Sequence, residues 1–208
     1  MKHIQVTERD REIFRYVGQR GLATTQTIHQ TFWDGRTLQT AQDRLTQLTK
    51  GGYLRTATTD ARGRAEQIYW LSRKATQLFS AAERASFVKG NPTQAEIGHV
   101  LTTSEVIEKL KGKYQVSHFV HERALKGELK RGASTVLADA RAELDGIDYL
   151  IEIDSPHYTG QRLRRKGAGF GKAGKPTLWV VGGQARLHTV SQSVAGYANI
   201  QVVLLGEL

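Results

Sequence analysis

Apolar residues in the first part of the chain recur every three or four positions, which is the spacing of a helix that buries one face. Thr7 is a hydroxyl N-cap with an acid three residues later, and we expect a first helix from there to Gly18 or Gly21. A short second helix is expected to start at Thr24 or Thr25.

A third helix is predicted to open at Thr37 and to end at Gly51-Gly52. Its expected apolar stripe consists of Leu38, Ala41, Leu45 and Leu48. Residues 53–58 and 67–71 then alternate as strands do, and the hairpin loop between them carries Arg62 and Arg64. Three helices followed by a basic-tipped hairpin is the order of a winged helix-turn-helix, which we assign to residues 1–85.

The triplet Gly90-Asn91-Pro92 is a strong stop signal, so we expect a domain boundary at about residues 84 to 93. Beyond it the pattern predicts helices at 93–110, 159–170 and 184–195, and strands at 114–122, 134–142, 147–154, 177–181 and 201–205. The last two strands are almost wholly apolar, which is typical of a sheet covered on both faces. Residues 93–208 are therefore predicted to form an α/β domain.

The charge balance favours a polyanionic partner. Lys and Arg number 30 against 20 Asp and Glu, a net charge of +10, and the part before the break carries +7 of it. Nucleic acid, an anionic membrane and an acidic protein all fit this charge. The sequence has no cysteine, which excludes disulfides and thiolate metal sites, and it shows neither a signal peptide nor a membrane span. We expect a cytoplasmic protein with no membrane partner.

The predicted third helix exposes side chains of the kind that reach base edges and phosphates in a major groove. With the two arginines of the hairpin, which would reach the adjacent minor groove, the expected contacts to double-stranded DNA are Arg36, Gln39, Thr40, Asp43, Arg44, Gln47, Lys50, Arg62 and Arg64. No cofactor is required for this binding. The alternative is a polar face that only meets solvent.

The residues from Thr7 to Phe14, from Leu22 to Ile28 and from Arg44 to Leu54 resemble the opening of the plasmid replication-relaxation proteins. The resemblance implies a winged-helix accessory protein of a plasmid or mobile element that acts in replication, relaxation or conjugative DNA processing. Implied protein partners are a relaxase or a replication protein, and a homodimer is a further expectation. A winged-helix transcriptional repressor whose second domain only dimerises is another alternative.

The resemblance continues in the second domain, in His121-Glu122-Arg123, in residues 137–140 and 149–154, and in residues 176–181. This arrangement is similar to a PD-(D/E)xK nuclease, a restriction-endonuclease-like fold. In such a fold two acids on adjacent strands hold Mg²⁺ or Mn²⁺, and a lysine orients the water. The resemblance implies Asp139 and Glu152 as the acids, both for catalysis and, with Asp154, for metal binding.

Asp154 stands where the nucleases carry the lysine, and Ala138 where they carry the proline. Lys166, one helix later, is the candidate replacement for the catalytic lysine. One alternative is a metal-dependent endonuclease or nickase. The other, which we favour, is a scaffold without enzymatic activity, whose acids pair with Arg162, Arg164 or Arg165. The basic run from Arg162 to Lys175 has no acid within it, and it is either a solvated face or a second phosphate-contacting patch.

Overall fold

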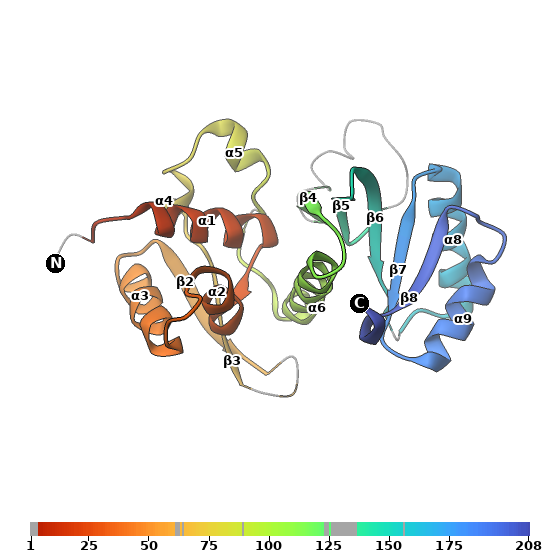
Figure 1. The fold of residues 1–208 in the computed structure, drawn as a ribbon, viewed down its shortest axis with the longest axis horizontal. Helices are drawn as coiled ribbons and strands as arrows, with labels where there is room; N and C mark the ends of the chain where they lie inside the picture. The colour runs from red at the N-terminus through yellow and green to blue at the C-terminus, as the bar shows by residue number, and fades with distance from the viewer. Residues whose placement is uncertain are drawn as a thin grey trace. The chain divides into compact units, whose positions relative to one another are not determined.

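The computed structural model describes residues 4–60, 63, 65–88, 90–122, 125, 137–155 and 157–208. Arg62 and Arg64, the expected hairpin contacts, lie outside these residues. The chain divides into two compact units, Met1–Leu101 and Thr102–Leu208. The fold is a mixture of helices and two sheets (Figure 1).

The first unit builds helices around a small antiparallel sheet of order β1-β3-β2. Its elements are α1 (Glu8–Arg20), β1 (Ala23–Thr24), α2 (Thr25–Phe32), α3 (Leu38–Lys50), β2 (Leu54–Thr59), β3 (Glu66–Leu71), α4 (Arg73–Thr76), α5 (Ala81–Ala85) and the first turns of α6 (Gln94–Lys111). Three helices precede the β2–β3 hairpin, in the order that the sequence predicts.

Local capping chemistry sets the helix starts of the first unit. Thr7 forms a capping box with Asp10 at the start of α1, and the Thr24 hydroxyl accepts a hydrogen bond from the backbone of Thr27 at the start of α2. The buried face of α3 holds Ala41, Leu45 and Leu48. Leu38 departs from the expected stripe, because at the first turn of α3 it points out of the core and is 37% exposed.

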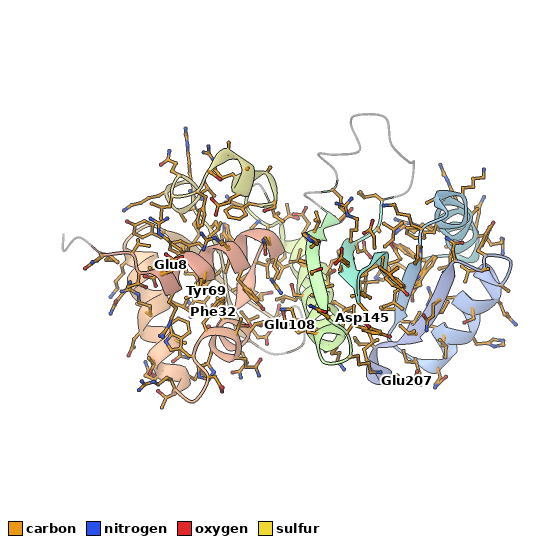
Figure 2. All side chains as sticks on the ribbon, turned by 45° about the horizontal axis from the view of Figure 1, so that its top comes forward. Glu8, Phe32, Tyr69, Glu108, Asp145 and Glu207 are labelled. Atoms are coloured by element: carbon orange, nitrogen blue, oxygen red, sulfur yellow. The ribbon has the colours of Figure 1, made fainter. Side chains whose placement is uncertain are left out.

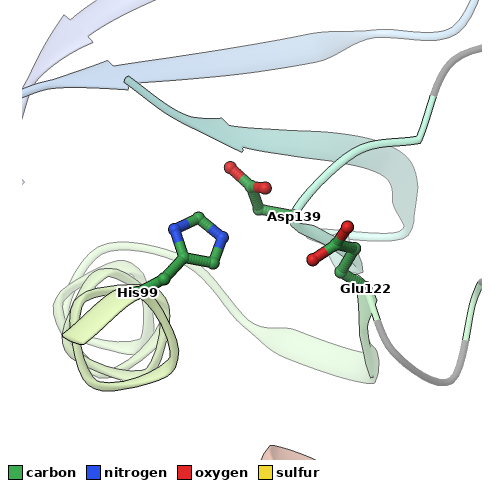
Figure 3. A group of neighbouring side chains, drawn as sticks. All are labelled: His99, Glu122 and Asp139. Carbon is green, nitrogen blue, oxygen red and sulfur yellow. The ribbon is translucent and has the colours of Figure 1, made fainter. Parts of the chain in front are cut away.

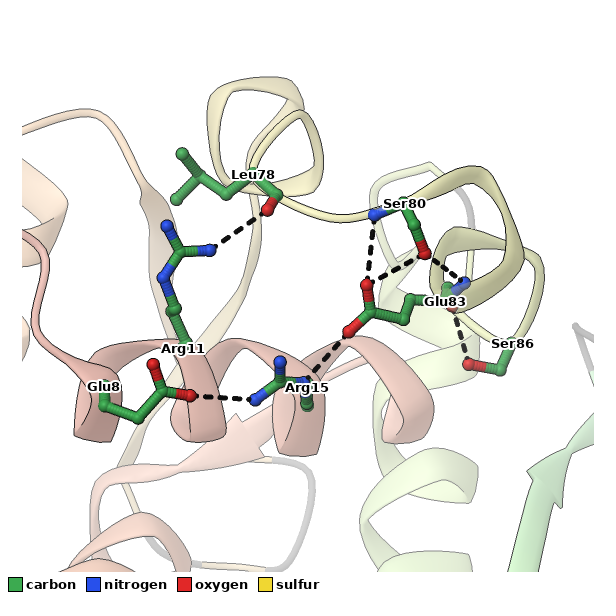
Figure 4. Close-up of polar contacts among 7 residues, drawn as sticks. All are labelled: Glu8, Arg11, Arg15, Leu78, Ser80, Glu83 and Ser86. Carbon is green, nitrogen blue, oxygen red and sulfur yellow. Dashed lines mark hydrogen bonds and ion pairs between the residues drawn. The ribbon is translucent and has the colours of Figure 1, made fainter.

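The segment after the hairpin forms two short helices, α4 and α5, capped by Ser72 and Ser80. Polar contacts hold α5 and the turn that follows α4 against α1 (Figure 4). An Arg11 nitrogen donates to the Leu78 carbonyl at 3.1 Å, and Arg15 pairs with Glu83 at 3.2 Å. Glu83 also completes the capping box of α5. This extension is therefore part of the first unit.

The second unit contains a five-stranded sheet of order β4-β5-β6-β7-β8. Its elements are the later turns of α6, β4 (Val116–His121), β5 (Ala140–Leu144), β6 (Ile147–Ile153), α8 (Gly160–Ala173), β7 (Thr177–Val181), α9 (Gln184–Val194), β8 (Ile200–Leu204) and a final 3₁₀ turn, Leu205–Glu207. Strands β4, β5 and β6 run antiparallel, whereas β6, β7 and β8 run parallel. The β5–β6 turn holds Asp145, which is labelled in Figure 2, and Gly146. Both residues have positive φ angles.

Side chains alternate across this sheet and give the unit three layers. Leu178 and Val180 of β7 pack with α6, whereas Trp179 and Val181 pack with α8 and α9. Phe170 of α8 meets Trp179 edge-on, with ring centroids 5.8 Å apart. The nearly continuous apolar run of β7 thus reflects a strand that is covered on both faces. Among the described residues, none of the helices has the length and apolar character needed to cross a membrane.

Candidate functional site

Asp139 and Glu152 stand side by side at one end of the β5–β6 ladder. Ala140 pairs with Ile151 in the antiparallel register, so the residue before Ala140 lies beside the residue after Ile151. We expected Asp139 to lie within a strand, but it directly precedes β5. Its Oδ2 accepts a hydrogen bond from the backbone N–H of Ile153 at 2.7 Å, which fixes the carboxylate.

Lys166 reaches this pair from α8. The Thr159 side chain caps α8, and the helix places the Lys166 ammonium on Oε1 of Glu152. The Tyr158 hydroxyl lies 3.2 Å from Nζ of Lys166 and 3.4 Å from the same Glu152 oxygen. The three residues proposed for catalysis, Asp139, Glu152 and Lys166, are therefore brought into one cluster, with Tyr158 as a fourth member.

Burial makes this cluster electrostatically unusual. Glu152 is completely buried, and burial together with the negative charge of Asp139 raises the pKa of Glu152 to about 8. Burial alone would lower the pKa of Lys166, but Glu152 and Asp139 outweigh it and raise that pKa. Oε2 of Glu152 is buried and has no hydrogen-bond partner among the residues that the structure describes. The cluster can therefore take a proton or a cation at this oxygen.

Asp154 is used differently from the other two acids. Arg186 of α9 binds both of its oxygens, with nitrogen-to-oxygen distances of 2.6 Å, and the Asp154 side chain is only 3% exposed. We expected Arg162, Arg164 or Arg165 as the cationic partners of the acids. The structure instead gives Arg186 to Asp154 and Lys166 to Glu152, while the Arg162 guanidinium lies 4.5 Å from the centroid of the Tyr158 ring.

Glu122 is a neighbour that the sequence did not single out for a role. Its backbone N–H donates to the Asp139 carbonyl at 2.8 Å. One carboxylate oxygen of Glu122 and one of Asp139 lie within 4.8 Å of each other, and Figure 3 draws both acids with His99 of α6. The signal for Glu122 was its place at the end of the predicted strand 114–122. Carboxylates on adjacent strand ends are the ligands that Mg²⁺ and Mn²⁺ prefer.

The first unit presents a second candidate surface on α3. Opposite the buried face of this helix, the expected DNA contacts that are exposed to solvent are Arg36, Gln39, Thr40, Asp43, Gln47 and Lys50. Gln39 donates to the Asp43 carboxylate at 2.8 Å, so two of these side chains are already oriented along the helix. The exposed Leu38 lies in the same first turn.

Arg44 has a different environment from the rest of that face. Its Nε lies 3.0 Å from one oxygen of Asp10, and a second nitrogen contacts the other oxygen and the Gln5 carbonyl. Asp10 belongs to the capping box of α1 and is 1% exposed. A further Arg44 nitrogen donates to Gln47 at 2.9 Å. Arg44 thus ties α3 to the start of α1.

One comparison with known proteins assigns the chain to a family. The model of the replication-relaxation family matches residues 14–179, which include α3, Asp139, Glu152 and Lys166. No curated protein and no solved structure matches the chain. The match covers most of the 208 residues, and the chain belongs to the replication-relaxation family.

Proposed function

We propose that this protein is a double-stranded-DNA-binding accessory factor of a plasmid or mobile element, and that its first unit reads the DNA as a winged helix-turn-helix. Membership of the replication-relaxation family indicates a role in plasmid replication or relaxation. Within that role, the proposed protein partners are a relaxase or a replication protein.

The exposed polar face of α3 carries this proposal. The helix is held from behind by Ala41, Leu45 and Leu48, and at its side by the Arg44–Asp10 pair. The helix is therefore already ordered before binding, so its insertion into a major groove would not require a loss of backbone conformational entropy. Gln39 and Gln47 suit adenine edges, and Leu38 suits a thymine methyl group.

Charge supports the same surface. Arg36 precedes α3 and Lys50 ends it, so a cation stands at each end of the helix where the phosphates flanking a groove would pass. The net charge of +10 adds a long-range attraction for DNA. The β2–β3 hairpin follows α3 directly, in the position of a wing.

Selection of a preferred duplex from a random pool, followed by affinity measurements on α3 variants, tests the proposal. Gln39→Ala or Gln47→Ala should weaken binding to the preferred duplex by about 1–3 kcal/mol, and binding to random DNA much less. Thr31→Ala, on the neighbouring helix α2, is the control. If neither glutamine variant changes the ratio of specific to non-specific affinity, α3 is not the reading helix.

Metal-assisted cleavage of DNA is a second candidate function, and the contact between Lys166 and Glu152 favours it. Glu122 and Asp139 offer carboxylate oxygens within 4.8 Å of each other that suit Mg²⁺ or Mn²⁺. Glu152, beside Asp139 at the end of the β5–β6 ladder, adds a buried Oε2 that has no hydrogen-bond partner among the described residues, and a cation would explain it. A bound ion would polarise a phosphate and acidify a water molecule. The protein itself supplies the ammonium of Lys166, placed beside the acids by α8.

Incubation with supercoiled plasmid and Mg²⁺ or Mn²⁺ separates this candidate from a scaffold without activity. Nicking that is lost in Asp139→Asn, Glu152→Gln and Lys166→Met but kept in Gln192→Ala, a change at an exposed position of α9, would establish a nuclease. Plasmid that stays supercoiled with the wild-type protein under both metals would reject it.

A further inference from the structure

The chain after Asp154 has an extreme charge composition. Residues 155–206 contain seven lysines and arginines and no aspartate or glutamate. They include both α8 and α9, the helices that cover one face of the large sheet. In this half of the second unit, every acid that neutralises a cation must come from another segment.

Three of the seven cations have such a partner. Lys166 pairs with the buried Glu152, Arg186 with Asp154, and Lys175 with Asp148 at 2.7 Å. The remaining four are Arg162, Arg164, Arg165 and Lys172. In the part of the chain that the structure describes, no carboxylate lies within ion-pair distance of these four side chains.

All four unpaired cations lie exposed on α8 and form a basic α8 face, defined by Arg162, Arg164, Arg165 and Lys172. The opposite side of the helix is packed through Leu163, Gly167 and Phe170. The charges are thus fixed to a helix that is anchored in a core. Arg162 is further oriented by the Tyr158 ring.

We propose that the basic α8 face binds the phosphate backbone of the same duplex that the first unit reads. This inference rests on the proposed function and extends it to the second unit. Arg162 and Lys172 are ten residues apart, about 15 Å along a helix that rises about 1.5 Å per residue. Duplex DNA carries one charge per about 1.7 Å of its axis, so this face spans several phosphates.

The same surface is a poor match for a membrane. A helix that lies in a bilayer interface presents an apolar face to the lipid. The apolar residues of α8 are buried against Trp179, Val190 and Val194, and its exposed face is polar. Charge without exposed apolar surface favours phosphate contacts made through water and counterion release.

The salt dependence of DNA affinity in the full-length protein tests the inference. Each lost phosphate contact lowers the slope of log affinity against log salt by about 0.9. We expect the quadruple alanine variant of the basic α8 face to lower the slope by about 2 to 4, measured on a random duplex between about 50 and 200 mM salt. Lysine at the three arginine positions should restore most of the slope, because phosphate contacts need the charge.

The matched control is Lys175→Ala, which removes an exposed cation that is already paired with Asp148 and should leave the slope unchanged; Asp148 keeps Arg141 as a second partner at 3.8 Å. A quadruple variant with a wild-type slope and a wild-type far-UV spectrum would overturn the inference, even while α3 variants still lose specificity. If instead the quadruple variant loses all binding and α3 variants lose none, the α8 face stands and the proposed reading by the first unit fails.

Discussion

Arg44→Ala should destabilise the first unit more than any exposed charge on it. The substitution leaves the Asp10 carboxylate buried without its cation and removes the hydrogen bonds to Gln5 and Gln47. Asp10 keeps the backbone N–H and the hydroxyl of Thr7, at 2.7 and 2.8 Å. The loss is therefore large but not complete.

The magnitude follows from burial. Removing one partner of a buried ion pair costs about 3–5 kcal/mol. The Arg44 side chain is 24% exposed, and Thr7 still serves Asp10, so we expect about 2–3 kcal/mol. At about 4–8 °C per kcal/mol for a domain of about 60–100 residues, the Tm of this unit should fall by about 10 °C or more.

Urea unfolding at several pH values measures the effect. Burial alone would raise the pKa of Asp10, but the hydrogen bonds from Arg44 and Thr7 outweigh it and lower that pKa below 3.8. A carboxylate with a lowered folded pKa stabilises above its unfolded pKa, and this stabilisation is lost as the pH falls through the folded pKa. The difference between wild type and Arg44→Ala should therefore shrink on acidification below about pH 4.

The control is Arg15→Ala, whose ion pairs with Glu8 and Glu83 are exposed to solvent and should be worth about 0–1 kcal/mol. The two substitutions remove the same charge from the same unit. Equal losses of unfolding free energy in the two variants would refute the reasoning, because they would show that burial of Asp10 adds nothing.

Two further predictions concern the second unit. Because the pKa of Glu152 is raised from 4.5 to about 8, this side chain stabilises the folded second unit below pH 4.5, and that stabilisation is lost as the pH rises to about 8. Urea unfolding at several pH values measures this decline, which should be absent in Glu152→Gln. Gly171→Ala should cost about 1–3 kcal/mol, because its new Cβ would lie 2.1 Å from the Tyr197 ring, whereas Gly160→Ala meets nothing closer than 3.6 Å and should leave the Tm unchanged or higher. A pH-dependent decline that persists in Glu152→Gln, or equal Tm values for the two glycine variants, would contradict them.

Local signals in the sequence predicted most of the elements. Thr7 caps α1 as we expected, Thr24 rather than Thr25 caps α2, and the apolar run 177–181 is the strand β7. These predictions held because each depends on neighbouring residues. The Asp145-Gly146 turn, which we did not predict, carries a local signal of the same kind, since an Asp-Gly pair between two strands favours the positive φ angles that the structure shows.

Packing explains where the sequence prediction was wrong. Leu38 fits the helical period but lies at the first turn of α3, beyond the edge of the core. The stretch 73–85 has the composition of one continuous helix, but Ser80 starts a new one. Gly167 and Gly171 give no local sign of a packing role, whereas in the structure they let α8 approach Val194 and Tyr197 closely. These features depend on how segments pack together, which the pattern within a single segment does not show.

The ion pairs were the least predictable part of the candidate sites. Arg44 finds Asp10 across 34 residues, and Arg186 finds Asp154 across 32. In the sequence, Arg44 fits the exposed face of a recognition helix as well as Gln39 does. Only the fold shows that Arg44 pairs with the buried Asp10, whereas Gln39 is exposed to solvent.

The Arg186–Asp154 pair also bears on whether this unit could cleave DNA. A third carboxylate in place of a lysine would repel both hydroxide and phosphate. Arg186 binds both oxygens of Asp154 and so neutralises that charge within its own pair. What remains beside Asp139 and Glu152 is one ammonium, supplied by Lys166 from the next helix. Two acids and one lysine are the groups that metal-assisted hydrolysis needs, so the substitution at Asp154 by itself is no reason to reject a nuclease.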